Sequence, residues 1–131
     1  MEEQGYVSLW LGKCSTYEEL DNYLSGSYTD DGDYIKSSFE RDFKIDRFDE
    51  DFREAFCDDF SAHDFEKLLL GCSYEKLVIP EFAKHFRLDS KEEFNAGLLL
   101  YDFRYQGQVK EILSKGIYLK YIGSVEYDKI Y

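Results

Sequence analysis

The chain has 131 residues, of which 44% are hydrophobic, and its formal net charge at pH 7 is −12. A chain of this length can bury one hydrophobic core, so we expect a single domain over residues 1–131. The negative charge argues against binding to nucleic acid or to anionic membranes, because both depend on lysine and arginine. It favours a basic protein partner and fast association with that partner.

The cysteines and the N-terminus indicate a cytoplasmic protein. The odd number and wide spacing of Cys14, Cys57 and Cys72 do not form a disulfide framework and favour reduced thiols. The acidic N-terminus lacks the pattern of a signal peptide, and no apolar run is long enough to span a bilayer.

The chain opens with a strand and a helix. Alternating residues over 6–11 predict a strand with Trp10 on the face opposite Val7, Leu9 and Leu11, ended by Gly12. Ser15 and Thr16 are each followed three residues later by Glu, which is the signature of a helix start. The predicted helix ends near Gly26 and has as its inward residues Tyr17, Leu20 and Leu24.

The middle of the chain reads mainly as helices. Residues 27–34 predict a loop, and Ser37 with Glu40 predicts the start of a short helix whose inward residues are Ile35, Phe39 and Phe43. A second helical stripe follows, with a strand as the alternative for its first part; it comprises Phe48, Phe52, Ala55, Phe56 and Phe60.

Two more helices are expected before the last strands. One starts at Ser61 and ends at Gly71, with inward residues Phe65, Leu68 and Leu69. The next has Pro80 in its first turn, where proline needs no hydrogen-bond donor. Its apolar residues are Ile79, Phe82, Ala83 and Phe86.

Residues 95–105 are the best candidate for the central strand, because the first half is apolar on both faces. Asp102 and Arg104 are expected to share one face of this strand. Residues 109–113 predict a short helix, with a strand as the alternative, and residues 117–127 predict a last strand with a bulge or turn at Gly123. The sequence therefore predicts an α+β fold: a small, mainly antiparallel or mixed sheet, with strands near both termini and helices packed on it.

The sequence carries no recognisable catalytic or metal-binding motif. Cys57, His63, Cys72 and His85 are metal-ligand types, but their gaps do not match the spacing of a zinc site. The acidic run 30–33 fails as a calcium loop, because a serine stands where the bidentate glutamate belongs. We therefore expect no enzyme, no cofactor and no metal, with a small metal- or thiol-dependent enzyme as a remote alternative.

The remaining candidate for function is an acidic surface interleaved with aromatic side chains, which supply contact area at low entropic cost. The strand end at Tyr105 is a secondary candidate for partner contact. The primary candidates are Asp30, Asp31, Asp33, Tyr34, Asp49, Glu50, Asp51, Asp58 and Asp59.

Several segments, in order, resemble one protein family. They are Val-Ser-Leu-Trp-Leu-Gly at 7–12, Thr-Tyr-Glu-Glu-Leu at 16–20, Phe-Asp-Glu-Asp-Phe at 48–52, Leu-Leu-Leu-Gly-Cys-Ser-Tyr at 68–74, the strand 95–105, and Tyr-Ile-Gly-Ser-Val-Glu-Tyr at 121–127. Together they resemble the immunity protein 22 family of bacterial polymorphic toxin systems.

The resemblance implies a cytoplasmic, non-enzymatic antitoxin that binds one cognate toxin domain and blocks it. Families of this kind often face nucleases, whose substrate channels are basic, and an acidic face could occupy such a channel as a polyanion would. The alternative is an acidic adaptor or scaffold protein with no toxin partner. The oligomeric state stays open.

Overall fold

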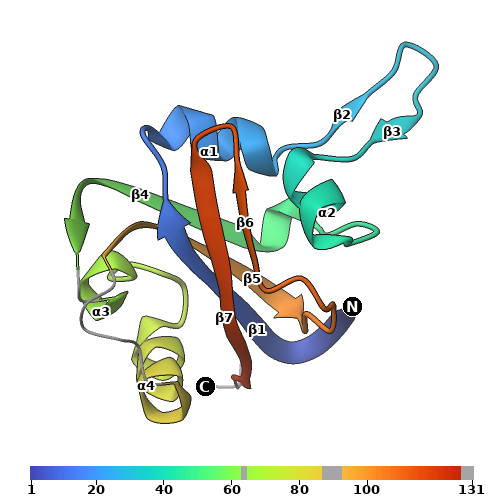
Figure 1. The fold of residues 1–131 in the computed structure, drawn as a ribbon. Coiled ribbons are helices and arrows are strands. Elements are labelled where there is room, and N and C mark those ends of the chain that lie inside the picture. The colour runs from blue at the N-terminus through green and yellow to red at the C-terminus, as the bar shows by residue number, and fades with distance from the viewer. Residues whose placement is uncertain (63–64, 87–92, 128–131) are drawn as a thin grey trace.

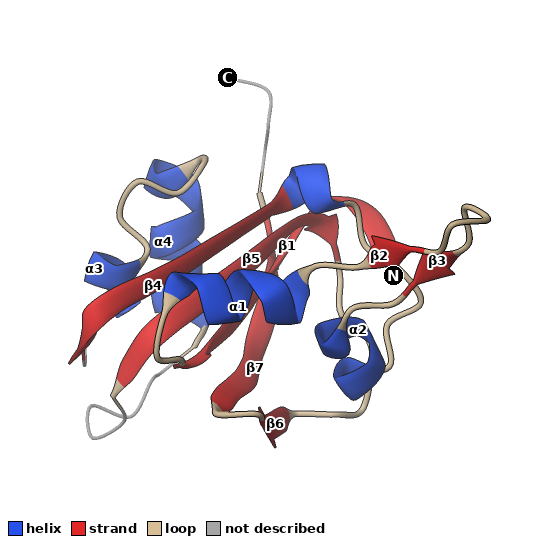
Figure 2. Cartoon of the chain, turned by 90° about the horizontal axis from the view of Figure 1, so that it is seen from above, coloured by secondary structure: helices blue, strands red, loops and turns tan. Residues whose placement is uncertain are grey.

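The computed structural model describes residues 1–62, 65–86 and 93–127, and only the backbone of residues 59–62 and 65. Five strands form one antiparallel sheet with helices on both faces (Figures 1 and 2). Their order across the sheet is β4-β5-β1-β7-β6. The strands are β1 (Glu2–Lys13), β4 (Arg53–Ala62), β5 (Phe94–Phe103), β6 (Glu111–Ser114) and β7 (Ile117–Glu126).

Each face of the sheet has its own core. Helices α1 (Tyr17–Leu24) and α2 (Ser38–Phe43) cover one face, and α3 (Phe65–Leu68) and α4 (Glu75–His85) cover the other (Figure 2). This arrangement confirms the predicted α+β class. Among the described residues, no helix is long and apolar enough to cross a membrane.

A small hairpin projects beyond the sheet (Figure 1). It consists of β2 (Ser27–Tyr28) and β3 (Tyr34–Ile35), within a segment that was predicted to be a loop. The sequence had placed Ile35 on the inward face of α2, but this side chain is 41% exposed in the hairpin. A 3₁₀ turn, η1 (Glu50–Phe52), leads from this region into β4.

The middle strand of the sheet is β1. The predicted central strand corresponds to β5, which lies one position away, between β1 and β4. The predicted faces of β1 are confirmed: Val7, Leu9 and Leu11 pack under α4, and Trp10 packs under α1 and α2. The strand is longer than predicted, because Gly12 continues it and pairs with both neighbours. A side chain at Gly12 would meet the carbonyl oxygen of Tyr118 at 1.7 Å, so only glycine permits this close approach.

β5 is buried on both faces, as predicted, but its alternation changes near its end. Asp102 has a left-handed backbone with φ of 54°, and Phe103 and Tyr105 therefore pack on the same face as Leu100. Asp102 was expected to share a face with Arg104, but its side chain has other partners in the structure. Asp102 accepts hydrogen bonds from the Gly5 amide and the Tyr127 hydroxyl.

The preferred helix over residues 48–60 was wrong. The strand alternative applied to the first part of this segment, which forms η1 instead, and the strand β4 begins only at Arg53. β4 pairs with β5 over Arg53–Cys57, so its state is set by a neighbour distant in sequence. Ala55 packs on one core and Phe56 on the other, as a strand between two helix layers requires. The helical spacing of the phenylalanines was a coincidence.

Three other local predictions were wrong. The helix predicted to start at Ser61 cannot do so, because Ser61 belongs to β4, and α3 spans only Phe65–Leu68. Residues 109–113 do not form a helix. Instead, β6 starts at Glu111 and pairs with the start of β7, and a strand was the stated alternative. Pro80 is not in the first turn of its helix, because α4 already begins at Glu75. The earlier start adds a turn that carries Val78, a fully buried side chain.

The start signals of two helices and the bulge in the last strand are confirmed. Thr16 caps α1 by accepting from the Glu19 amide, although Tyr17 in this helix is half-exposed instead of inward. Ser37 and Glu40 form the predicted capping box of α2. In β7 the register shifts beside Gly123, so Ile122 is the bulged residue.

Candidate partner-binding surface

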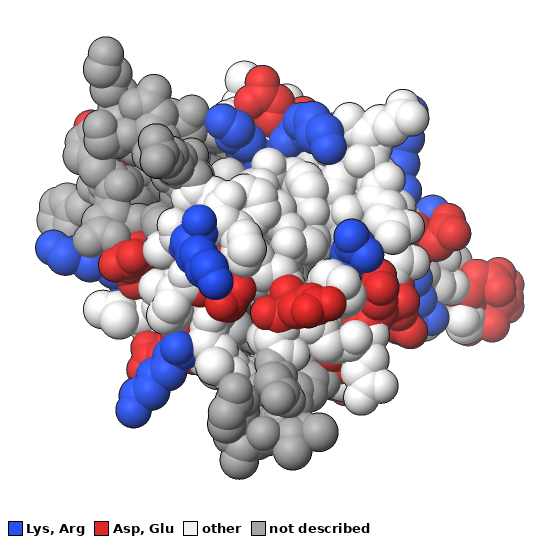
Figure 3. All heavy atoms as spheres, turned by 90° about the horizontal axis from the view of Figure 1, so that it is seen from below, with Lys and Arg blue, Asp and Glu red and all other residues white. Residues whose placement is uncertain are grey.

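The hairpin places three carboxylates at its tip. The turn is closed by two backbone hydrogen bonds, from the Thr29 amide to Asp33 and from the Gly32 amide to Thr29, each of 2.9 Å. Gly32 has a φ of 88°, which is a conformation that glycine adopts without strain. Asp30, Asp31 and Asp33 are therefore exposed. Figure 3 shows a group of acidic side chains at the end of the molecule where the hairpin lies.

Two tyrosines and an arginine form the base of the hairpin. The rings of Tyr28 and Tyr34 meet edge to face with centroids 5.4 Å apart. The Arg47 guanidinium lies over the Tyr34 ring at 4.4 Å and donates a 2.8 Å hydrogen bond to the Tyr28 hydroxyl. This contact orients both rings, although Tyr28 is still 60% exposed.

Tyr34 is anchored to α2 through Glu40. Its hydroxyl donates a short hydrogen bond to Glu40 Oε1, which also accepts from the backbone amide and hydroxyl of Ser37 at 2.9 and 3.0 Å. Burial, followed by this hydrogen bond, raises the pKa of Tyr34 above its usual value. Since Glu40 is completely buried, the capping box of α2 also fixes the base of the hairpin.

The turn before β4 supplies a second acidic segment. Asp49 begins it, since its side chain accepts from the Asp51 amide at 2.9 Å and its carbonyl accepts from the Phe52 amide at 3.0 Å. Glu50 accepts from the Gly26 amide at 3.1 Å and so ties the turn to the start of the hairpin. Arg53 then donates to Asp21 of α1 at 2.6 Å, which fixes the other end of the turn.

Two hollows join along this turn. The first has a volume of about 430 Å³, and its lining residues are Glu2, Gly26, Tyr28, Tyr34, Arg47, Phe48, Asp49, Glu50 and Asp51. The second has a volume of about 400 Å³, and its lining residues are Glu2, Glu3, Gln4, Phe48, Asp49, Phe52, Leu100, Tyr101, Asp102 and Phe103. They share Glu2, Phe48 and Asp49, and we call the joined surface the acidic groove.

The acidic groove combines negative charge with exposed aromatic rings. Among the described residues that line the groove, Arg47 is the one basic residue, and it already contacts Tyr28 and Tyr34. Tyr28 and Phe52, one at each end, are 60% and 44% exposed. The carboxylates in the lining are those of Glu2, Glu3, Asp49, Glu50, Asp51 and Asp102.

The structure brings together some of the residues singled out from the sequence. Tyr34, Asp49, Glu50 and Asp51 line the same hollow, and the three tip aspartates extend from the same hairpin. Asp58 is exposed on β4 but lines neither hollow of the groove. The side chain of Asp59 lies outside the described residues.

The prediction for Tyr105 rested on an exposed position, and that premise was wrong. Its side chain is 4% exposed and packs against Trp10. Its hydroxyl donates to the carbonyls of Phe43 and Val109 at 3.2 and 2.9 Å. The left-handed residue Asp102 turned the end of β5 so that this ring points into the core.

Several residues that line the groove were not predicted from the sequence. Glu2 and Glu3 looked like a polar chain end, but Glu2 pairs with Phe103 in the sheet and so reaches the groove. Asp102 had been assigned to a surface ion pair. Phe52 had been assigned to a helical stripe, and Arg47 carried no signal beyond its residue type. Neither could be placed at the groove from the sequence, because the groove forms only when distant segments meet.

The residues considered for metal or thiol chemistry are separate from the groove. Among the described residues, no group of three or more His, Cys, Asp and Glu side chains could hold a metal ion. His85 lies 3.2 Å from Glu81 on the exposed side of α4, Cys72 is buried, and Cys57 contacts Cys14. His63 lies outside the described residues.

The comparisons with known proteins point to one family. Immunity protein 22 matches residues 7–128, which is nearly the whole chain. No curated protein and no solved structure matches the chain. The family match has the extent that the ordered segments had suggested, so the chain belongs to the Immunity protein 22 family, and this membership supports an immunity role.

Proposed function

We propose that the protein neutralises one cognate toxin domain by binding it directly in the cytoplasm, with the acidic groove and the adjoining hairpin as the contact surface. The observation that carries this proposal is the joining of two hollows lined by six carboxylates and bordered by exposed aromatic side chains. In this proposal the protein binds the toxin domain and catalyses no reaction on it.

The charge of the chain favours a basic toxin. A net charge of −12 attracts a positive partner over a long range and raises the rate of association. Nucleases are toxins of this kind, because their channels bind the phosphates of a nucleic acid. The acidic groove then occupies such a channel in place of the substrate.

The exposed aromatic residues supply the tight binding that surface charge does not provide. Charges at the rim of an interface mainly change the association rate, whereas tight binding depends on buried aromatic anchors. Phe52 and Tyr28 are the large exposed rings that line the groove, and each loses solvent contact when a partner covers it. We assign them the anchor role.

The test is binding to the toxin domain encoded beside the gene of this chain. Glu2 and Asp51 line the groove and are exposed, and neither side chain caps a helix or a turn, so the double variant E2K/D51K reverses charge without breaking the fold. We expect at least a tenfold loss of affinity, mostly in the association rate at low salt. F52A is expected to raise the dissociation rate instead.

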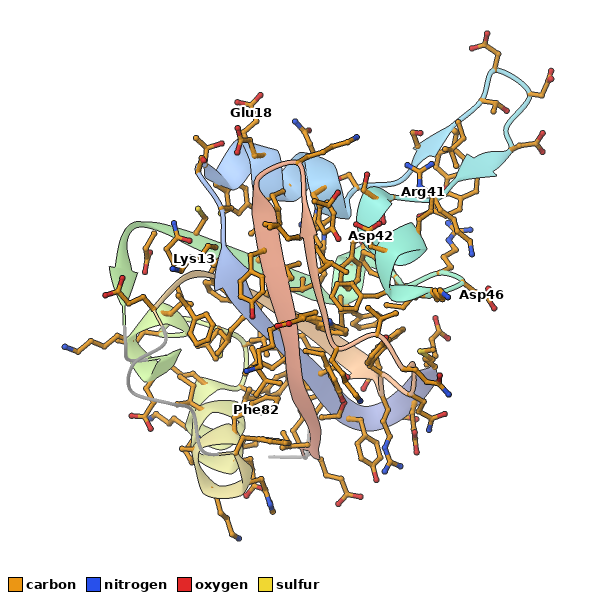
Figure 4. The ribbon with its side chains drawn as sticks, viewed as in Figure 1. Lys13, Glu18, Arg41, Asp42, Asp46 and Phe82 are labelled. Carbon is orange, nitrogen blue, oxygen red and sulfur yellow. The ribbon has the colours of Figure 1, made fainter. Side chains whose placement is uncertain are left out.

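The matched control is the double variant E18K/E111K, which makes the same change in charge outside both hollows. Glu18 lies on α1 (Figure 4) and Glu111 on β6. If the control weakens binding as much as E2K/D51K, the groove is not the interface. If co-expression of the chain does not protect cells from the toxin domain, direct neutralisation is wrong, and several weak partners would favour an adaptor protein.

A further inference from the structure

Two cysteines from distant parts of the chain meet beneath α1. The sulfur atoms of Cys14 and Cys57 are 2.7 Å apart, and both thiols are free. A disulfide bond is about 2.05 Å long. The two sulfur atoms are therefore closer than a non-bonded contact and need only a small approach to form a bond.

Cys14 follows the end of β1 and Cys57 lies on β4, and β5 lies between these two strands. Its residue Ala96 pairs with Gly12 on one side and with Cys57 on the other. Ala96 and the two cysteines belong to the same core, so the small methyl group leaves room for the sulfurs to meet across the strand. Cys14 directly follows Lys13, the end of β1 in Figure 4.

Asn95 of β5 holds both sides of the pair in place. Its side chain accepts a 2.9 Å hydrogen bond from the Cys14 amide and donates to the Cys14 carbonyl at 2.7 Å. The same amide group donates to the Asp58 carbonyl at 3.1 Å, next to Cys57. One side chain thus fixes the backbone beside each cysteine, and the contact between the sulfurs is held from both strands.

We propose that Cys14 and Cys57 form a redox-sensitive pair that closes to a disulfide when the protein meets a peroxide. The Cys57 sulfur attacks one oxygen of hydrogen peroxide, the O–O bond breaks, and the products are a sulfenic acid and one water. The Cys14 sulfur then attacks the Cys57 sulfur, the S–O bond breaks, and the hydroxide leaves with the Cys14 proton as a second water. The two thiols lose two electrons and the peroxide gains them.

The surroundings of the two sulfurs give this order of reaction. Cys57 is partly exposed, so an oxidant reaches it first, whereas Cys14 is 6% exposed. Burial, together with the hydrogen bond to Cys57, raises the pKa of the Cys14 thiol to about 12. Cys14 therefore serves as the resolving thiol, because it is already in contact with the sulfur that it must attack.

The disulfide would close a long part of the chain. The two residues are 43 positions apart, and the segment between them contains α1, the hairpin, α2 and η1. Cross-linking a long loop reduces the entropy of the unfolded chain and so stabilises the fold. The disulfide would thus tether the hairpin and η1, which form part of the acidic groove. The proposal itself rests on the sulfur geometry, so it stands or falls independently of toxin binding.

The experiment treats the full chain with hydrogen peroxide, blocks the remaining thiols, and measures the intact mass and the disulfide map without reduction. We expect the chain to lose two hydrogen atoms and the free thiols to fall from three to one, with Cys14 joined to Cys57. The midpoint of thermal unfolding should rise by roughly 10 °C and return after reduction.

Three variants make the result specific. C72S should oxidise like the natural chain, whereas C57S and C14S should form no intramolecular disulfide. Because Cys14 is buried, C14S serves as a control only if its circular dichroism spectrum matches that of the parent protein. If the spectra differ, C57S alone provides the test. Oxidation of Cys57 to sulfinic acid with Cys14 left free, or a disulfide map that involves Cys72, would overturn the proposal.

Discussion

Trp10 is the residue on which the core beneath α1 and α2 depends. It is fully buried, and its ring meets those of Phe39, Phe43, Tyr105 and Tyr121 at centroid distances of 5.2 to 5.9 Å. Its indole nitrogen has no hydrogen-bond partner among the residues that the structure describes, and its contribution to stability comes from packing. The rings that surround it come from α2, from β7 and from the segment after β5.

Replacing Trp10 by alanine should lower the free energy of unfolding by about 3–5 kcal/mol, because the large cavity cannot be filled by its aromatic neighbours. Urea unfolding followed by circular dichroism measures the change. The control is L113A, since Leu113 is 78% exposed and should change stability by less than about 0.5 kcal/mol. Equal losses in the two variants would contradict the central role of Trp10.

Buried tyrosines make the fold sensitive to alkaline pH. Burial first, and then a hydrogen bond to a carboxylate, raises the pKa of both Tyr23 and Tyr101 above the usual value. The Tyr101 hydroxyl donates to Glu54 at 2.7 Å and to the Ser73 carbonyl at 2.8 Å. The folded chain therefore keeps these hydroxyls protonated at a pH where the unfolded chain ionises them.

The sign of the effect follows from linkage. Below about pH 10 both states are protonated, so this contribution to stability is fully present. As the pH rises further, the unfolded state loses protons first and the free energy of unfolding falls. Urea unfolding at increasing pH should show this loss, with a shallower slope in Y101F. A free energy of unfolding that does not fall above about pH 10, or a slope that Y101F leaves unchanged, would contradict the prediction.

Among the elements, β1 shows why one glycine is required in a middle strand. A Cβ atom at Gly12 would lie 1.7 Å from the Tyr118 carbonyl oxygen and 2.9 Å from Leu119 Cα, and both are backbone atoms that the sheet holds in place. At Gly97 in β5 the nearest atom would be Leu69 Cδ2 at 3.3 Å, the end of a side chain that can turn away.

G12A should therefore lower the free energy of unfolding by roughly 3 kcal/mol through loss of the pairing between β1 and β7. G97A should cost much less, because Leu69 can adjust. Chemical unfolding of both variants measures the difference, and hydrogen exchange of the β7 amides locates it. A larger loss in G97A than in G12A would show that the close approach of the two strands is not the limiting contact.

Structural features that depend on residues close together in the chain were predictable from the sequence, whereas those that depend on distant contacts were not. The faces of β1, the caps at Thr16 and Ser37 and the bulge beside Gly123 were predictable, since each depends on residues close together in the chain. β4 was not predictable, because its pairing with β5 decided between two periodicities that its phenylalanines both fit. The position of Tyr105 depended on the backbone of a single residue, Asp102.

At the scale of the whole molecule, the candidate site could be predicted only in part. Its acidic and aromatic character was visible in the composition and in the runs 30–33 and 49–51. The groove itself was not, because its walls come from β1, the hairpin, η1 and the end of β5, which meet only in the folded chain. No pattern in the sequence connects Glu2 with Phe52.

The hairpin tip should affect the partner more than the fold. The variant D30K/D31K/D33K changes three solvated side chains, so we expect the free energy of unfolding to change by less than about 0.5 kcal/mol. Association with the toxin domain should slow, and its dependence on salt should weaken, because attraction over a long range is reduced. Stopped-flow measurements at low and high salt test this. Unchanged association at low salt would place the interface away from the tip.

The projection of the hairpin also bears on how a protein of this fold can acquire a new partner. Its tip residues touch neither core, so their substitution leaves folding almost unaffected while it alters the charge and shape that a partner meets. Trp10 and Gly12 have no such freedom. If the tip contacts the toxin domain as proposed, recognition and stability reside in different residues, and selection can change the partner without lowering the stability of the fold.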